Sequence, residues 1–300
     1  MRVLITGGGG FLGSALVSKL SRRKGIQLAV LDAFVHGFPR NLPKKKNIDA
    51  PVVGNIRNYY DIYRLMDRFR PDVVYHLASH ITRPESVGNF RTCSEVNYVG
   101  TANLIDSCVQ LKESGPKKII YASGESARSP VSHFGISKLA SENLLEALCP
   151  DMGISIATLR LAEIYGPSIV NTSASVTNFL IDHVVKNEPV ALFGPNKKKD
   201  HVYIDDAVRA LELSLDTEFK LLSKVDIGTG EAIKMSDLAQ LIKKLSASST
   251  VFKFIDSPYV RVVDSVSDTK IAKEVLGFET EANFDETLAA YVLKRKKDLK

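Results

Sequence analysis

The sequence predicts an α/β fold, in which a doubly wound parallel sheet carries helices on both faces and a smaller C-terminal lobe is interleaved with it. Two observations predict this fold. Short apolar runs of strand length alternate with amphipathic stretches of helix length through roughly the first 160 residues. The first run ends in a cluster of glycines and leads directly into a helical stretch. Alternating strands and helices form right-handed βαβ units, which build a parallel sheet with helices on both faces.

The composition is that of an ordinary globular protein. The chain has 300 residues, of which 44% are hydrophobic and 25% are charged, so it can bury a substantial core. No apolar run reaches the ~18 residues that a membrane-spanning helix requires. The first residues form a short strand that runs into glycines, which is not the pattern of a signal peptide. We therefore expect a cytoplasmic protein with no membrane partner.

Cysteines and charges exclude further classes of protein. Cys93, Cys108 and Cys149 are too few and too scattered for a disulfide framework or a zinc site, so we expect buried thiols and no metal. The net charge of +6 is modest, and its lysines cluster in expected loops and in the C-terminal tail. Such clusters are mostly solvated, so we expect no nucleic-acid partner. The lysines at 197–199 need separate attention, because they can face an anionic ligand.

The first part of the chain alternates strands with helices in a regular order. Continuous apolar runs bounded by polar or turn-forming residues predict strands. These strands are expected at residues 3–6, 27–32, 51–53, 72–77, 118–123 and 154–161. Longer amphipathic stretches lie between them and predict helices. These helices are expected at residues 11–20, 60–69, 93–111 and 134–148.

The order of elements becomes irregular after Gly166 and Pro167. Helices are expected at residues 176–186, 205–215, 235–245, 269–276 and 284–294. Extended segments are expected at residues 225–227 and 251–255. This second part is too irregular to continue the sheet in order, so it is expected to form a smaller lobe interleaved with the first part.

The glycine cluster after the first strand predicts a phosphate-binding turn. Gly7, Gly10 and Gly13 permit a tight turn, a close approach of the backbone to a pyrophosphate, and close packing of helix on strand. Phe11 and Leu12 open the helix, whose N-terminal N–H groups and dipole attract phosphate. A glycine cluster alone often marks only a turn, but this one has the required strand before it and helix after it.

Asp32 ends the second strand, 19 residues beyond Gly13. A carboxylate at this position accepts hydrogen bonds from both ribose hydroxyls and repels a 2′-phosphate, which favours NAD over NADP. The structural alternative is an aspartate that caps a loop. Arg40 and Lys44 leave NADP open as the second choice. We therefore expect residues 1–165 to form a Rossmann-type NAD-binding domain, to which later segments return, and residues 166–300 to form mainly a substrate-binding lobe.

Motifs along nearly the whole chain resemble the extended short-chain dehydrogenase/reductase family, in particular the NAD-dependent nucleotide-sugar epimerases and dehydratases that are similar to UDP-glucose 4-epimerase. Residues 6–13 are similar to the family's Thr-Gly-x-x-Gly-Phe-Ile-Gly turn. Residues 97–104 resemble its Asn-x-x-Gly-Thr-x-Asn-Leu helix, and residues 160–167 and 202–206 resemble its later landmarks. The resemblance implies NAD as the cofactor, a nucleotide-diphosphate sugar as the substrate, and catalysis that begins with transient oxidation of the sugar.

The resemblance also implies positions along the cofactor. Asn55 and Ile56 lie in a segment similar to the family's Gly-Asp-Ile-Arg, whose polar residue reaches the adenine, with Asn in place of Asp. Leu77, Ala78 and Ser79 belong to a segment similar to its His-Leu-Ala-Ala, which lies along the cofactor.

Phe134 stands where the resemblance leads one to expect a catalytic tyrosine. In the family, a tyrosinate removes a hydroxyl proton, and the lysine four residues later lowers the tyrosine pKa and holds the nicotinamide ribose. Lys138 keeps this spacing, so both side chains lie on one face of the expected helix. A phenyl ring cannot accept a proton, so general-base catalysis by this route is excluded.

A second departure concerns the hydroxyl that the family places beside the reacting oxygen. That position aligns best with Gly124, with Ser123 or Ser126 as substitutes if the turn is remodelled. Only 10 residues separate Ser123 from Phe134, which is shorter than the family's usual connection. A loop that normally lines the substrate pocket is therefore expected to be truncated.

Three residues are candidates to replace the tyrosine. Glu125 is one, because related dehydratases use a carboxylate in this turn. His133 adjoins Phe134 but points about 100° away around the helix, and His80 follows the cofactor strand and can face the pocket. Each has a structural alternative: Glu125 as a cap or salt-bridge partner, His133 as a residue of the first helical turn, and His80 as a loop histidine.

The residues expected at the substrate end give conflicting indications. Glu163 occupies the position of a family asparagine that donates to the diphosphate, which an ionised carboxylate cannot do. Lys199 matches a diphosphate-binding arginine of the family, and Arg261 is a candidate for a second basic contact. A nucleotide-diphosphate sugar is therefore implied by the resemblance and is not established by these residues.

The sequence leaves three interpretations open. The first is an NAD-dependent nucleotide-sugar epimerase or dehydratase that acts through a rearranged site. The second is a non-catalytic protein that binds NAD and a sugar nucleotide for regulation or assembly. The third is an engineered Tyr→Phe variant, although one such substitution would not explain Gly124 or the short connection. The resemblance further implies a homodimer through the helices at 93–111 and 134–148.

Overall fold

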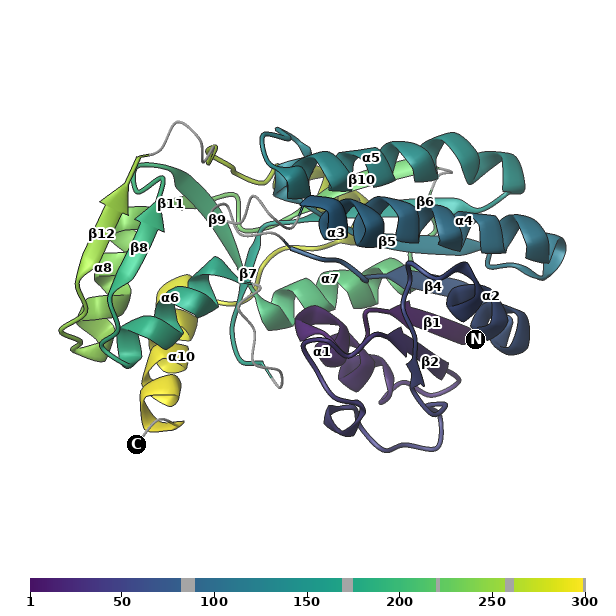
Figure 1. Cartoon of the computed structure of the whole chain (residues 1–300), viewed down its shortest axis with the longest axis horizontal. Helices are drawn as coiled ribbons and strands as arrows, with labels where there is room; N and C mark the ends of the chain where they lie inside the picture. Colours follow the sequence, from purple (N-terminus) through teal and green to yellow (C-terminus); the bar gives the residue numbers. More distant parts are fainter. Residues whose placement is uncertain (82–89, 169–174, 220–221, 257–261, 299–300) are drawn as a thin grey trace.

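A seven-stranded parallel sheet forms the centre of the larger lobe in the computed structural model, which describes residues 1–81, 90–168, 175–219, 222–256 and 262–298 (Figure 1). Its strand order is β10-β6-β5-β4-β1-β2-β3, and every neighbouring pair is parallel. The order reverses between β1 and β4, which is where open α/β sheets bind ligands at the carboxyl ends of their strands. The strands are β1 (Arg2–Thr6), β2 (Gln27–Asp32), β3 (Val52–Val53), β4 (Val73–His76), β5 (Lys118–Gly124), β6 (Ser155–Leu161) and β10 (Leu222–Ile227).

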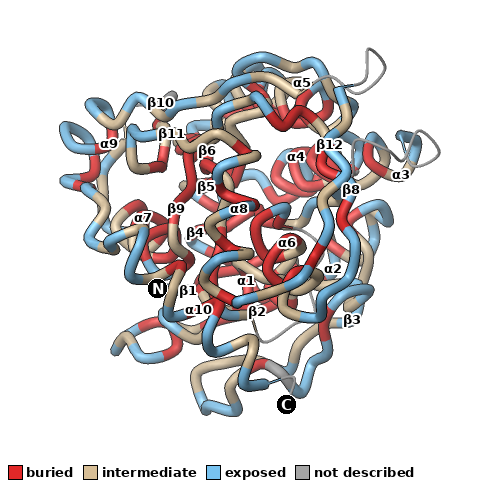
Figure 2. The backbone as a smooth tube through the Cα atoms, turned by 90° about the vertical axis from the view of Figure 1, so that its left-hand side faces the viewer, coloured by how far each residue is buried: buried red, intermediate tan, exposed pale blue. Residues whose placement is uncertain are grey.

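Helices cover both faces of this sheet, as the sequence predicts. Val3 and Ile5 face one core and Leu4 faces the other, because successive side chains of a strand point to opposite faces. One face is covered by α1 (Phe11–Leu20), α7 (Ile204–Asp216) and α9 (Thr269–Leu276), and the other by α2 (Tyr59–Phe69), α4 (Gly100–Leu111) and α5 (His133–Leu148). Figure 2 shows buried segments gathered in the interior and exposed segments at the periphery.

The prediction of a single continuous helix at 93–111 is wrong in one respect. The segment consists of α3 (Phe90–Ser94), a π-helical turn η3 (Glu95–Val99) and α4. The carbonyl oxygen of Asn97 accepts hydrogen bonds from the hydroxyls of Thr101 at 2.5 Å and Ser141 at 2.9 Å. Side chains that take a helical carbonyl in this way disturb the regular ladder, and π turns are one of the results.

In the residues that the structure describes, the smaller lobe has two short sheets and three helices. The order β11-β9-β7 forms a mixed sheet and β12 pairs with β8 in parallel. Only β12 among these strands is expected from the sequence. The others were missed because they are short, and β9 begins with two lysines and an aspartate rather than an apolar run. The strands are β7 (Glu163–Tyr165), β8 (Val190–Phe193), β9 (Lys198–Tyr203), β11 (Ala232–Lys234) and β12 (Phe252–Ile255), and the helices are α6 (Val176–Val185), α8 (Met235–Ser246) and α10 (Phe284–Asp298).

The two lobes are interleaved along the chain. The segment expected to be extended at 225–227 belongs to β10, which pairs with β6 at the edge of the large sheet. Helix α7 packs against α1, and α9 packs against β10. The other predicted helices and strands are confirmed, most of them to within two residues at each end. Short 3₁₀ turns complete the structure at η1 (Pro39–Asn41), η4 (Lys112–Ser114), η5 (Glu125–Ala127) and η6 (Pro150–Met152).

Cys93, Cys108 and Cys149 are buried, as expected, and none of them forms a disulfide among the described residues. Within the described ranges, no helix combines the length and apolar character needed to cross a membrane.

Candidate active site

The glycine turn at the end of β1 is held by the backbone and has no room for side chains. The N–H of Gly7 donates to the carbonyl of Leu31 at 2.8 Å, and Gly7 has a φ of +72°. A Cβ at Gly7 would lie 2.6 Å from the backbone nitrogen of Ala78, and a Cβ at Gly13 would lie 2.1 Å from the carbonyl oxygen of Gly7. Both contacts are too short for any side chain, so the close approach of turn, helix and strand requires glycine.

The N-terminus of α1 is open to an anion. The helix begins at Phe11 after Gly10, and no side chain caps it. Its first turn, which includes Leu12, contains no acidic residue. The N–H groups and the positive end of the helix dipole therefore face the carboxyl edge of the sheet without a competing carboxylate. This arrangement fits the pyrophosphate of a dinucleotide.

Asp32 lies beside this turn at the end of β2. Its Oδ2 accepts a hydrogen bond from the N–H of Gly9 at 2.8 Å, and its Oδ1 accepts one from the N–H of Phe34 at 2.6 Å. Two backbone donors thus orient the carboxylate next to the glycine turn. Arg40 stacks on the ring of Phe38, with its guanidinium carbon 4.3 Å from the ring centroid. The turn, the open helix end and the oriented carboxylate fit NAD, with Asp32 available for the ribose hydroxyls.

The segment after β3 is anchored to α4. The N–H of Asn55 donates to Asp61 Oδ2 at 2.8 Å, and its side-chain oxygen accepts from Arg57. Ile56 is buried, and its carbonyl accepts a hydrogen bond from Asn103 Nδ2 at 2.9 Å. A Cβ at Gly100 would lie 2.7 Å from the Ile56 side chain, so the glycine lets the two segments pack closely. The structure thus places both residues beside the large sheet, next to the end of β2.

A buried histidine joins the strands of the cofactor edge to α4. His76 Nδ1 and the hydroxyl of Thr6 are 2.8 Å apart, and His76 Nε2 and the hydroxyl of Thr101 are 2.9 Å apart. Burial lowers the pKa of His76 to about 3, so the ring is neutral at ordinary pH. The Thr6 hydroxyl also accepts a hydrogen bond from the N–H of Ala78 at 3.3 Å. Leu77 follows β4 and is buried in the core beneath.

Asn97 organises the loop that follows β4, a role that the sequence motif alone did not indicate. Its side-chain oxygen accepts from the hydroxyl of Ser79 at 3.2 Å and from the N–H of His80 at 2.8 Å. Its amide nitrogen donates to the hydroxyl of Ser137 on α5 at 2.8 Å. Burial, and then His36, lowers the pKa of His80.

Lys138 is buried beneath the end of β5. Its side chain is 3% exposed, and Nζ donates to the carbonyl of Ala122 at 2.6 Å. Nζ also lies 4.5 Å from the ring centroid of Tyr121 and 5.8 Å from that of Phe134. Burial lowers the pKa of Lys138 to about 7, against the opposing effect of the Glu142 carboxylate. This lysine can therefore exchange a proton near neutral pH.

Gly124 faces the ring of Phe134. A Cβ on Gly124 would lie 3.6 Å from Cε1 of Phe134 and 3.5 Å from Oγ of Ser126. The Ser126 hydroxyl is buried and has no hydrogen-bond partner in the part of the chain that the structure describes. His133 is exposed at the start of α5, with its ring 5.6 Å from that of Phe90. The structure thus brings Gly124, Ser126 and Phe134 together, and Ser126 is the hydroxyl that the turn directs toward this point.

Ser123 is one of the two substitutes that the sequence left open, and its hydroxyl is held in a buried network. Its Oγ donates to Glu142 Oε1 at 2.5 Å, and Arg160 binds both oxygens of the same carboxylate at 3.0 and 2.6 Å. Glu142 is fully buried, so it needs these partners. Ser123 follows Tyr121 on the face of β5 that packs under α5, and its hydroxyl is committed to this structural network.

The residues expected at the substrate end form a bridge between the lobes. Lys199 Nζ on β9 donates to Glu125 Oε1 at 2.7 Å, and the hydroxyl of Ser265 donates to the other oxygen of Glu125. Glu163 on β7 accepts a hydrogen bond from the N–H of Val176 at 2.7 Å, at the start of α6. Burial and then the nearby Glu125 raise the pKa of Glu163. Arg261 lies outside the described residues.

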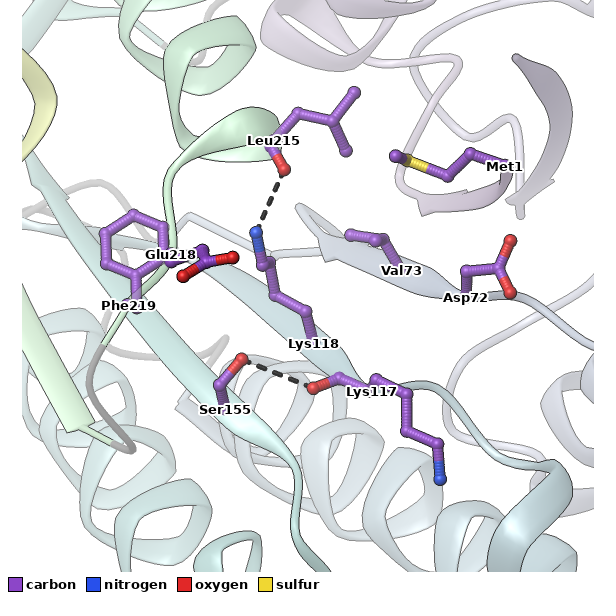
Figure 3. A pocket seen from close by; sticks show the side chains of 9 residues that line it. All are labelled: Met1, Asp72, Val73, Lys117, Lys118, Ser155, Leu215, Glu218 and Phe219. Atoms are coloured by element: carbon purple, nitrogen blue, oxygen red, sulfur yellow. Dashed lines mark hydrogen bonds between the residues drawn. The ribbon is translucent and has the colours of Figure 1, made fainter. Parts of the chain in front are cut away.

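A hollow of about 410 Å³ lies at the opposite edge of the large sheet (Figure 3). Met1, Asp72 and Ser155 line it at the amino ends of the strands. Its half-buried cation, Lys118, already donates to the carbonyls of Leu215 at 2.9 Å and Thr217 at 2.8 Å at the end of α7. Ligands of open α/β sheets bind at the carboxyl edge, so this hollow is not the candidate site.

A model of the family described as "NAD dependent epimerase/dehydratase family" matches residues 3–228. This match spans the glycine turn, Lys138 and the ion pair between Glu125 and Lys199. The chain belongs to the NAD-dependent epimerase/dehydratase family. A putative UDP-glucose 4-epimerase of Methanocaldococcus jannaschii is 28% identical over 263 residues, which cover 80% of this chain and 81% of the relative.

Solved structures of this family match the whole chain. The UDP-glucose 4-epimerase of Thermotoga maritima with UDP-glucose has a TM-score of 0.87 at 29% identity and covers 100% of both chains. The Thermus thermophilus UDP-glucose 4-epimerase in complex with NAD has a TM-score of 0.86 at 26% identity and covers 99% of both chains. A tyrosine-to-phenylalanine mutant of the Bacillus cereus UDP-glucuronic acid 4-epimerase, in complex with UDP-4-deoxy-4-fluoro-glucuronic acid and NAD, has a TM-score of 0.86 at 25% identity and covers 100% of both chains. Structural relatives in this epimerase/dehydratase family therefore bind NAD and nucleotide sugars.

Proposed function

We propose that the protein is an NAD-dependent oxidoreductase that acts on a nucleotide-diphosphate sugar by transient hydride transfer at one sugar carbon, with Phe134 in place of the usual tyrosine. The observation that carries the proposal is the position of Lys138, buried at the carboxyl end of β5 and in the same site as the glycine turn and Asp32. A chain that had lost all use for the cofactor would not need a buried lysine, whose charge is costly to desolvate.

Each of the following residues would have a separate role in binding or catalysis. Gly7, Gly10 and Gly13 would admit the pyrophosphate, and Asp32 would bind the ribose that carries the adenine. NAD, when bound, supplies the hydride acceptor and donor. Lys138 would bind the nicotinamide ribose and, with a pKa near 7, would exchange a proton at the reacting end.

The hydroxyl at this end would come from Ser126. Its Oγ is buried without a partner among the described residues and lies 3.5 Å from the point where a Cβ of Gly124 would be. A buried hydroxyl without a partner costs free energy, and a substrate hydroxyl would satisfy it. Glu125 is less suited as a base, because Lys199 and Ser265 already bind both of its oxygens.

A non-catalytic role is the second candidate, and one observation favours it. Gly124 and Phe134 face each other. The first has only a hydrogen atom as its side chain and the second has a phenyl ring, so neither side chain can donate or accept a proton. The protein would then hold NAD and a sugar nucleotide without turnover. The B. cereus mutant complex supports this reading, since that protein holds both ligands with a phenylalanine in place of a tyrosine.

Product analysis of the NAD-loaded protein tests both candidates. UDP-hexoses and dTDP-hexoses are incubated with the wild type and with Phe134→Tyr, and products and enzyme-bound NADH are measured. The leading proposal expects conversion of at least one hexose nucleotide by the wild type. Silence of the wild type with turnover by Phe134→Tyr indicates a disabled enzyme. Silence of both, with NAD and sugar nucleotide still bound, supports the non-catalytic role.

We also propose that two copies of the chain pair through α4 and α5. Apolar side chains are exposed on the outer surface of these helices, among them Val109 at 49% and Ile136 at 53%. Tyr98 in the adjoining π turn and Leu148 at the end of α5 are exposed as well. A second copy that brings the same two helices would bury this apolar surface in a four-helix contact with two-fold symmetry.

A further inference from the structure

Two positive features of the smaller lobe are occupied by carboxylates of the protein itself. The first is the N-terminus of α6, where the N–H of Val176 donates to Glu163 Oε1 at 2.7 Å. The second is Lys199, whose Nζ donates to Glu125 Oε1 at 2.7 Å. The side chains of Lys199 and Glu125 are only 17% and 18% exposed, so this ion pair is largely shielded from solvent. Solvent and salt therefore screen this ion pair less than an ordinary surface ion pair.

Both positive features are of the kind that binds phosphate. A helix N-terminus offers free N–H groups and the positive end of a dipole, and a lysine adds a full charge. The two features are close together, because Glu163 on β7 pairs with His201 on the neighbouring strand β9, two residues from Lys199. A phosphate group between β7, β9 and η5 would meet the same donors that the two carboxylates now use.

The N-terminus of α1 is not occupied by a carboxylate in this way. Helix α1 begins after Gly10 without a side-chain cap and without an acidic residue in its first turn. Helix α6 begins with Ser175, whose hydroxyl accepts from the N–H of Asn178, and Glu163 takes the N–H of Val176. The N-terminus of α1 is thus open to an anion, and the N-terminus of α6 is closed by an internal one.

We propose that Glu163 and Glu125 act as internal competitors for the phosphate group of the substrate, so that an anionic substrate binds at Lys199 and the α6 N-terminus only by displacing these two carboxylates. The inference rests on the proposed function, since it concerns recognition of the nucleotide-diphosphate sugar. The carboxylate pair (Glu125 and Glu163) then determines specificity, because it disfavours weakly bound anions and makes the site selective for a ligand that gains contacts elsewhere.

Displacement of the carboxylate pair is coupled to protons. Glu163 faces Glu125 from η5, Lys199 and His201 from β9, and the N–H of Val176 and the Ser175 hydroxyl from the start of α6. Burial lowers the pKa of His201 to about 4, so this ring stays neutral and adds no charge at neutral pH. Phosphate near Glu163 would raise the pKa of this carboxyl further, so binding would take up a proton and strengthen as the pH falls.

The test is calorimetric titration of the full-length, NAD-loaded protein with UDP, inorganic pyrophosphate and uridine. The variants are Glu125→Gln, Glu163→Gln and the double variant. Glutamine keeps a side-chain oxygen that can accept the Val176 N–H, so each variant removes charge and preserves the acceptor. Glu274→Gln, on the exposed surface of α9, is the matched control for the same change of charge. Thermal unfolding verifies that each variant is folded.

Each single variant is expected to bind UDP and pyrophosphate about ten-fold more tightly than the wild type, with uridine unchanged. The wild-type affinity for UDP is expected to rise as the pH is lowered from about 7.5 to about 6, and Glu163→Gln is expected to reduce this dependence. Unchanged or weaker UDP binding by both variants overturns the inference and leaves nucleotide binding by the wild type intact. Failure of UDP to bind any form, while NAD still binds, overturns the inference and the nucleotide-sugar substrate together.

Discussion

Gly124 faces Phe134 so closely that a Cβ on Gly124 would lie 3.6 Å from Cε1 of the ring. This is an ordinary van der Waals distance, so the site has room for a serine at position 124. The two positions at which the family resemblance expects a serine and a tyrosine are therefore neighbours in space. Their replacements remove both oxygens from a single point of the site.

Restoring both oxygens is expected to act cooperatively. Phe134→Tyr alone should raise the rate of hexose-nucleotide conversion by about 100-fold, since a positioned acid or base contributes on this scale. Adding Gly124→Ser should raise the rate further and by more than it does alone, because the two hydroxyls would share one substrate oxygen. The measurement is the initial rate of product formation for the wild type, both single variants and the double variant. Strictly additive effects would contradict a shared site of action.

Removal of the Asp32 carboxylate is expected to weaken NAD binding. Asp32→Ala loses charge-assisted hydrogen bonds to the ribose and the orientation of the Gly9 and Phe34 N–H groups, so its affinity for NAD should fall by about 10- to 100-fold. The affinity for NADP should fall less than the affinity for NAD, because the variant has no carboxylate to repel the 2′-phosphate. Titration of each cofactor measures both changes, with the exposed Asp151→Ala as the control. An equal loss for the two cofactors would argue against a ribose contact.

The buried Lys138 is expected to make the stability of the NAD-free protein depend on pH. Burial holds its folded pKa at about 7, below the ordinary value of 10.5. Between these values the unfolded chain binds more protons, so this group makes the free energy of unfolding rise with pH. Lys138→Met should therefore be more stable than the wild type near neutral pH, by on the order of 4 kcal/mol, and this advantage should shrink toward pH 10.5. Urea unfolding of both proteins across this range tests it, and a constant difference would show that the lysine is not desolvated.

The Glu142 network is expected to stabilise the larger lobe. Glu142→Leu leaves the Arg160 guanidinium and the Ser123 hydroxyl without their partner, so the free energy of unfolding should fall by about 3 kcal/mol. Glu146→Leu, one helical turn later, loses only a partly exposed ion pair with Lys224 and should cost less than about 1 kcal/mol. Urea unfolding compares the two variants. Similar losses for both would mean that the buried pair contributes no more than a surface one.

Pairing of two copies is expected to depend on α5. Ile136→Arg places a charge in the exposed apolar surface and should shift the protein from dimer to monomer. Val251 is 70% exposed in the smaller lobe, so Val251→Arg serves as the control and should leave the assembly unchanged. Light scattering coupled to size-exclusion chromatography gives the mass of each form. A wild-type protein that is already a monomer would exclude the proposed contact.

The larger lobe could be predicted from the sequence because its pattern is local. The strands of its sheet other than β10 are largely apolar runs, and the glycine turn can be recognised from the strand before it and the helix after it. The π turn at Glu95–Val99 could not be predicted, because it depends on the Asn97 carbonyl meeting Ser141 from a different helix. The strands of the smaller lobe were missed for a related reason, since β9 is polar and its pairing with β7 and β11 is not local.

The sequence indicated which residues belong to the candidate site better than it indicated which contacts they make. Gly124 and Phe134 were singled out from the sequence, and the structure brings them together. The partners of Ser123, Glu125 and Glu163 were not predictable, because each is supplied by another element through folding. Spacing along the chain indicates which side chains share a helix face, but it does not indicate which carboxylate reaches which cation.

The return of β10 and α7 to the large sheet affects any attempt to separate the two lobes into independent polypeptides. A polypeptide ended after residue 165 would lack both elements, so the whole edge of β6 would present unpaired N–H and C=O groups to solvent. The apolar surface of α1 that α7 covers would be exposed as well. Such a fragment is expected to aggregate. A transplant of the smaller lobe into a relative must therefore carry several separate segments of sequence at once, since neither lobe is an uninterrupted stretch of the chain.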